Sequence, residues 1–269
     1  MKKTAPLKWP LLSAMALSFA LLPSVARAEG LTSVSVGLDY ASGDYGTAET
    51  TRTYSAPLAI KHENGPWTLR ASLPYVYAEG TFSRDRGFEG DEPGDDNGGA
   101  GTATQGIRSE SGLGDLTLGI HYTVLNNPAG FSVDLGGKAK IATADKDKTL
   151  ITSGENDYSA QIDVFRSLPA VSVFATLGYT IKGEPTGVSY DDPFYGSLGL
   201  SVPVSTGKSI GIAWDYREKI VATSDPVSEL SAFFSMKLNP NHKMQIYVVH
   251  GLSDSSPDVG GGVVLTHLY

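Results

Sequence analysis

The stretch from Ser111 to Leu125, SGLGDLTLGIHYTVL, alternates between apolar and polar side chains. One parity carries Leu116, Leu118, Ile120, Tyr122 and Val124, and the other carries Asp115, Thr117, Gly119, His121 and Thr123. A period of two is that of a β-strand with one apolar and one polar face. The run matches the roughly ten residues that a tilted strand needs to cross a bilayer. It predicts a membrane-spanning strand whose apolar face meets lipid and whose polar face meets a lumen.

The average composition does not reveal this pattern. The chain has 269 residues, is 41% hydrophobic and has a mean hydropathy of −0.10, values that are also common in soluble proteins. Alternating strands average out in such a sum, so the low hydropathy is compatible with a barrel.

The N-terminus has the pattern of a secretory signal peptide. Lys2 and Lys3 precede an apolar run over 9–22, and Ala26-Arg27-Ala28 forms a small-residue cleavage pattern before Glu29. We therefore expect a signal peptide over residues 1–28 and a mature chain over 29–269. A start-anchored helix is the alternative, but the apolar run is short for a span.

Charge and cysteine content exclude some classes of protein. The full chain has a net charge of −8; without the four bases of residues 1–28, 17 bases stand against 29 acids, a net charge of −12. This balance disfavours a nucleic-acid partner. The absence of cysteine excludes disulfides, thiolate metal sites and cysteine nucleophiles. We expect no cofactor.

The alternation recurs along the chain and predicts about twelve strands, separated by turn residues. The expected ranges are 31–41, 51–62, 67–82, 111–125, 131–143, 157–168, 171–182, 194–204, 209–220, 227–238, 243–252 and 259–269. Pro74 falls on the inward parity of the third strand, where the missing donor predicts a bulge or a local break.

Short and long connections alternate between these strands, as they do in even-stranded outer-membrane barrels. The fold class is thus all-β: a transmembrane antiparallel β-barrel of about 12 strands in the cell outer membrane, with both termini periplasmic. A soluble β-sandwich also alternates. Here, however, the polar face is mostly Ser, Thr and Gly, and aromatic residues gather near strand ends.

The inward parity carries the candidate site residues. Two interpretations stay open: Lys138, Lys140, Arg217 and Lys219 form a positive ladder that attracts anions, or inward bases pair with acids such as Asp134, Asp163 and Asp215 in a filled interior. A twelve-stranded barrel is compatible with either. The full set expected along a transport path or pairing network is Arg70, Asp115, His121, Asp134, Lys138, Lys140, Asp163, Asp215, Arg217, Lys219 and Glu229.

Two other features of the sequence bear on metal binding and catalysis. The acidic connection 83–110 could bind a hard cation through Asp91, Glu92, Asp95 and Asp96, stay solvated, or fold into the mouth as a constriction. His250 near Ser253, and His121 near Thr123, lack the serine, histidine and acid spacing of a hydrolase. We expect no enzyme activity and no metal site.

The residues 73–77, LPYVY, and 111–122 resemble a paired motif of the proteobacterial outer-membrane family known as MetA-pathway of phenol degradation, or transporter. The resemblance implies a barrel of about twelve strands with an assumed passive uptake role; it supplies no catalytic residues.

The resulting hypothesis is passive uptake of small, aromatic or hydrophobic solutes. Its alternative is a structural or adhesive barrel with a filled lumen and functional external loops. The expected partners are outer-membrane lipid, the solute, and the barrel-assembly machinery through the C-terminal strand. That strand ends on Tyr269, where Phe is usual in such barrels.

Overall fold

The computed structural model describes residues 30–47, 49–82, 106–127 and 129–269. The expected signal peptide lies outside the described residues, as do residues 83–105 of the acidic connection, including Asp91, Glu92, Asp95 and Asp96. Within the described residues the regular structure is all β-strand. No helix there is long and apolar enough to span a membrane.

The described strands follow one another along the chain. They are β1 (Leu31–Gly43), β2 (Thr51–Asn64), β3 (Trp67–Phe82), β4 (Gly106–Leu113), β5 (Leu116–Asn127), β6 (Phe131–Ile141), β7 (Asp157–Ser167), β8 (Ser172–Ile181), β9 (Phe194–Ser205), β10 (Lys208–Arg217), β11 (Val227–Asn239), β12 (His242–Gly251) and β13 (Val259–Leu268).

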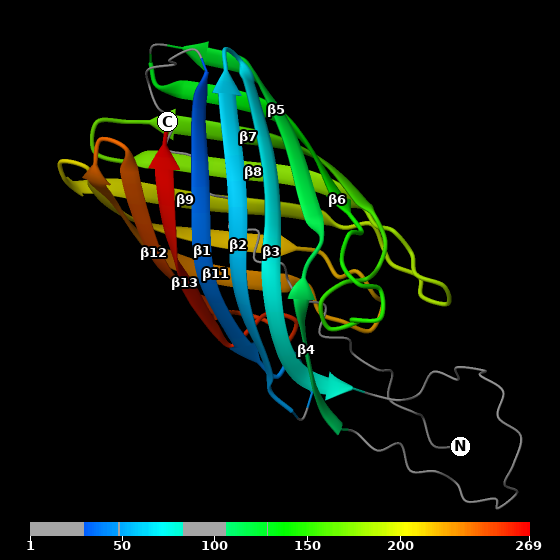
Figure 1. Ribbon diagram of the computed structural model, residues 1–269. Coiled ribbons are helices and arrows are strands. Elements are labelled where there is room, and N and C mark those ends of the chain that lie inside the picture. Colours follow the sequence, from blue (N-terminus) through cyan, green and yellow to red (C-terminus); the bar gives the residue numbers. More distant parts are fainter. Residues whose placement is uncertain (1–29, 48, 83–105, 128) are drawn as a thin grey trace, which may run out of the picture.

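These strands form a closed antiparallel barrel, as the sequence predicts. Consecutive strands pair with each other, except β4 and β5, and β1 pairs with β13 to close the sheet (Figure 1). Strands β4 and β5 both pair with β3, at successive levels, and so occupy one position in the barrel wall. The barrel therefore has twelve positions. Closure leaves no unpaired strand edge in contact with lipid.

The interruption between β4 and β5 lies beside Pro74. Ser72 faces Thr117 and Tyr75 faces Leu113, so two residues of β3 stand opposite three residues of the other strand. This is a one-residue β-bulge. The expected bulge or break thus exists, in the strand that pairs with Pro74. The bulge exchanges the inward and outward parities of the residues before it, so Leu113 faces outward and is 56% exposed. The single strand expected over 111–125 is therefore two strands.

The outer surface of the barrel is apolar. Large hydrophobic side chains on the predicted outward parity are exposed in strands all around the barrel, including Leu58, Leu118, Ile162 and Ile212. Buried hydrophobic side chains form only small clusters inside the barrel. One contains Val76, Ala78 and Leu150, and another contains Tyr247, Val249 and Val264. An exposed apolar belt around a closed sheet is the arrangement that lipid contact requires.

Short turns gather at one end of the barrel and longer connections at the other (Figure 1). The first and last strands meet at the short-turn end, where the Tyr269 amide donates to the Thr32 carbonyl over 2.9 Å. Strand β10 ends at Arg217 instead of the expected Ile220. The Glu218 amide still donates to the Phe194 carbonyl, but 218–220 form no further ladder.

Candidate functional site in the barrel lumen

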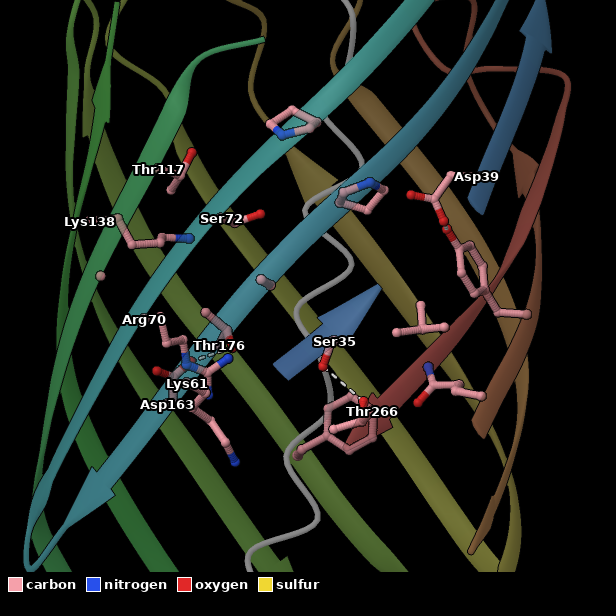
Figure 2. Close-up of a pocket in the computed structure, with 18 of the residues that line it drawn as sticks. Ser35, Asp39, Lys61, Arg70, Ser72, Thr117, Lys138, Asp163, Thr176 and Thr266 are labelled. Atoms are coloured by element: carbon pink, nitrogen blue, oxygen red, sulfur yellow. Dashed lines mark hydrogen bonds between the residues drawn. The ribbon is translucent and has the colours of Figure 1, made fainter. Parts of the chain in front are cut away.

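The lumen contains a cavity of about 1160 Å³. Residues of nearly every strand line it, together with residues 149–153 of the connection between β6 and β7. Figure 2 shows polar side chains such as Ser35, Arg70, Thr117 and Lys138 pointing into this space from different strands. The inward parity predicted from the sequence therefore faces a space large enough for a small organic molecule.

Several lumenal rings lie flat against the barrel wall because each has a glycine directly across from it. Phe174 faces Gly199, and Phe233 faces Gly211. A Cβ atom at either glycine would lie 2.2 Å from a ring carbon. Two further cross-strand pairs have the same arrangement: His121 with Gly136, and Tyr195 with Gly178. Tyr247 also faces a glycine, Gly262, but there the Asp39 carboxylate is the nearest group and the Tyr247 hydroxyl is 2.8 Å away.

Of these five rings, His121 is among the predicted site residues, whereas the other four are not. The signal was present, since each ring and each glycine lies on the inward parity, but it becomes visible only when the strand register is known. A ring that lies along the wall narrows the lumen less than one that projects into it. It also turns its face toward any solute in the cavity.

Two prolines form another part of the cavity lining. Pro57 and Pro74 face each other on β2 and β3, and both line the cavity. Each packs against a glycine: a Cβ atom at Gly37 would lie 2.9 Å from Pro57, and one at Gly114 would lie 2.9 Å from Pro74. The Pro74 carbonyl accepts a hydrogen bond from the Gly114 amide over 2.8 Å, which holds the bulge in place.

Polar side chains in the middle of the lumen form a network around Asp163. Its carboxylate accepts hydrogen bonds from Gln161 and from Thr176 over 2.6–2.7 Å. The His121 Nε2 lies 3.6 Å from the same carboxylate. Tyr195 donates to the Gln161 oxygen over 2.9 Å, and the Lys138 ammonium lies 4.8 Å from the centroid of the Tyr195 ring. The network links four strands, β5 to β8, with β9.

A second network lies at the end with the long connections. The Lys140 ammonium is 2.9 Å from Asp115 and 3.6 Å from Asp157, and Lys182 is 2.5 Å from Asp157. The Asp115 and Asp157 side chains are only 7% and 9% exposed. Buried charges of this kind need their partners, because an unpaired buried charge is costly.

Asp115 also holds the connection between β6 and β7. Its carboxylate accepts hydrogen bonds from Thr152 and from the amides of Thr143 and Ala144. Burial alone would raise the pKa of Asp115, but the hydrogen bonds from Thr152, Lys140 and Ala144 outweigh it and hold the pKa below its ordinary value.

The same connection reaches into the barrel. Leu150 packs against Val76 and Ala78, its amide donates to Glu110 over 2.8 Å, and Thr149 to Ser153 line the cavity. A constriction of the mouth by 83–110 stays a prediction, because 83–105 lie outside the described residues. In the part of the chain that the structure describes, residues 149–153 line the cavity in this way.

The predicted site residues divide into two groups. Eight line the cavity: Arg70, Asp115, His121, Asp134, Lys138, Lys140, Asp163 and Arg217. Asp215 and Glu229 face each other on β10 and β11 but are not part of the cavity lining. Lys219 lies beyond the end of β10, is exposed, and donates to the Ala222 carbonyl over 3.4 Å.

The ion pairs in the structure differ in detail from those expected among these residues. Lys140 contacts Asp115 and Asp157 in place of Asp134, Asp163 or Asp215. The register of β6 and β7 explains the contact with Asp157, because Lys140 stands directly opposite that residue. Among the described residues, no group of three or more His, Asp or Glu side chains is placed to hold a metal ion.

Comparison with known proteins agrees with this architecture. A family model described as "Putative MetA-pathway of phenol degradation" matches residues 90–267, about two thirds of the chain. The chain belongs to this family. The family assignment agrees with the resemblance carried by 73–77 and 111–122.

Solved structures share the fold of this family member. The COG4313 outer membrane channel from Pseudomonas putida F1 is 13% identical and has a TM-score of 0.70, over 92% of this chain and 99% of that chain. The KdgM porin, solved in complex with disordered oligogalacturonate, is 11% identical with a TM-score of 0.53, over 87% and 98%. A comparison with curated protein sequences finds no match. The chain has the fold of an outer-membrane β-barrel.

Proposed function

We propose that this protein is a passive outer-membrane channel for small solutes, including aromatic or hydrophobic compounds. The observation that carries the proposal is the cavity of about 1160 Å³, whose lining includes the Phe174 and His121 rings, each packed over a glycine. Flat rings keep the path open and present apolar faces to a planar solute. Membership of a family described by phenol degradation supports the same class of solute.

The orientation, the partners and the lack of enzyme activity belong to the same proposal. Both termini lie on the periplasmic side, next to the short turns, and the long connections lie outside. Tyr269 is 72% exposed at the end of the closing strand, where the assembly machinery would recognise it. The lumenal His121 serves in the polar network through Asp163 and not in catalysis.

A structural or adhesive barrel with a filled lumen is the rival. It is favoured by one observation: residues 149–153 and the ion pairs of Lys140 occupy part of the mouth. In that case the external connections carry the function, and solutes do not pass.

Planar-bilayer recording and liposome swelling separate the two. A purified barrel that migrates as a folded species on unheated SDS gels is expected to conduct ions and to admit phenol-sized solutes into liposomes. A folded barrel with neither conductance nor solute flux would remove the channel proposal and leave its rival.

A further inference from the structure

The cavity lining has the opposite charge balance to the chain as a whole. The chain carries a net charge of −8, yet the cavity-lining residues in the described part of the chain include nine bases and five acids. The bases are Lys61, Arg70, Lys138, Lys140, Lys182, Lys208, Arg217, Lys237 and Lys243; the acids are Asp39, Asp115, Asp134, Asp157 and Asp163. A positive lining in a low-dielectric wall concentrates anions.

The bases differ in whether an acid already neutralises them. Lys140 and Lys182 contact Asp157, and Lys61 lies 2.9 Å from Glu63. Arg70 and Lys138, in contrast, form no ion pair with any residue that the structure describes. The Nε atom of Arg70 is buried and has no hydrogen-bond partner there. A buried donor of this kind normally has a partner.

Arg70 and Lys138 flank a gap at Gly119. Gly119 stands directly across from Arg70 on one side and from Lys138 on the other. A Cβ atom at Gly119 would lie 3.7 Å from Arg70 Cβ and 3.7 Å from Lys138 Cγ, so the two basic side chains border the same space. Figure 2 shows both pointing into the lumen from their strands.

The neighbouring acids are near these two bases but form no direct ion pair with them. Both oxygens of Asp163 already accept hydrogen bonds from Gln161 or Thr176. Asp134 faces Asp163 across β6 and β7, and its Oδ1 is itself buried without a partner. Asp163 thus acts on Arg70 and Lys138 electrostatically without a direct ion pair, which leaves their N–H groups available to a group from outside the chain.

An aromatic ring lies beside Lys138, behind the residues that line the cavity. The Lys138 ammonium lies 4.8 Å from the centroid of the Tyr195 ring, which is held against Gly178 by its hydrogen bond to Gln161. A carboxylate matches the planar fork of a guanidinium, and an aromatic ring offers a flat apolar surface to a second ring.

We propose that Arg70, Lys138 and Tyr195 form a lumenal binding site for small planar organic anions, of which aromatic carboxylates are the simplest class. Arg70 and Lys138 bind the carboxylate at the Gly119 gap, and Tyr195 contacts the ring. The inference rests on the proposed channel function, because it names the charge and shape of the solute that the channel selects.

The test compares benzoate with phenol, a neutral molecule of similar shape, and with acetate, a carboxylate without a ring. Calorimetry on the detergent-solubilised barrel is expected to show binding of benzoate at least tenfold tighter than binding of phenol or acetate. In a planar bilayer under a KCl gradient, the reversal potential is expected to indicate a preference for chloride, and benzoate is expected to reduce the chloride current.

The variant Arg70→Gln with Lys138→Gln is expected to lose the benzoate binding at least tenfold and to shift the reversal potential toward cations. The matched control, Arg166→Gln with Lys219→Gln, removes the same charge from exposed positions outside the cavity and is expected to behave as the parent. Lys138→Gln alone provides a milder variant if the double variant does not fold, and it is expected to weaken benzoate binding.

Equal binding of phenol and benzoate would overturn the inference. So would benzoate binding that survives in the double variant. If the double variant does not fold, unchanged benzoate binding in Lys138→Gln would overturn it. A folded barrel without conductance would instead refute the proposed channel, while calorimetry would still decide whether the anion site exists.

Discussion

Gly178 lies directly across from Tyr195, and the Tyr195 ring covers the place that a side chain at position 178 would occupy. The three atoms nearest to a Cβ atom there, at 2.3–2.7 Å, all belong to the Tyr195 side chain. The ring, and not the backbone, is therefore what a larger residue would displace.

Replacement of Gly178 by Ala is expected to push the Tyr195 ring into the lumen and to break its hydrogen bond to Gln161. The lost hydrogen bond should cost about 1 kcal/mol of folding stability. Single-channel conductance should fall, because the ring now projects into the path. Adding Tyr195→Ser to Gly178→Ala should restore the conductance. An unchanged conductance in Gly178→Ala would show that this ring does not border the path.

The ion pairs of Lys140, at the end with the long connections, predict an effect on folding stability. Replacement of Lys140 by Glu would place a third acid between the nearly buried side chains of Asp115 and Asp157. Loss of a buried partner costs roughly 3–5 kcal/mol. The temperature at which the barrel loses its folded migration on SDS gels should drop markedly. Lys208→Glu, at an exposed position of the lumen, serves as the control and should leave that temperature nearly unchanged.

Asp115 predicts a pH response of the connection 142–156. Because its folded pKa lies below the ordinary value, ionised Asp115 stabilises the folded arrangement above the ordinary pKa. That contribution declines as the pH falls through the folded pKa. Proteolysis within 144–156 should therefore be slow at neutral pH and faster in strong acid. Asp115→Asn should be cleaved readily at neutral pH and should show a weaker pH dependence; protection equal to the parent would contradict this role.

The two faces of β5 should tolerate charge differently. Leu118→Arg places a cation on the exposed apolar belt, and Thr117→Arg places one in the cavity lining. A cation facing lipid at the bilayer midplane costs roughly 2–4 kcal/mol, whereas a lumenal one is solvated. Urea titrations of folding into lipid vesicles should show a large loss for Leu118→Arg only. Equal losses would mean that the assignment of the faces is wrong.

Much of the barrel could be predicted from the sequence because the alternation of apolar and polar residues is a local property. Leu116, Leu118 and Ile120 lie on the outward face as their parity requires, and the strands occur where turn residues permit. Eight of the eleven candidate residues line the cavity for the same reason.

The partners of those residues could not be predicted in the same way, because they depend on register between strands. Lys140 contacts Asp157 since the two stand opposite each other, a relationship that no period within one strand reveals. The pairing of rings with glycines has the same origin. The inward course of 142–156 depends on Leu150 reaching Val76 and Ala78, residues about seventy positions earlier.

The bulge between Leu113 and Leu116 separates two registers of the same pair of neighbours. On the short-turn side of the bulge, which we call below it, β5 pairs with β3. On the side of the long connections, above it, β4 pairs with the outer part of β3 in a register displaced by one residue. A change in the length of the outer hairpin would therefore alter only the phase above the bulge, while the barrel below keeps its inward and outward faces. The outer hairpin is nonetheless coupled to the lumen through Leu150, whose amide donates to Glu110 of β4.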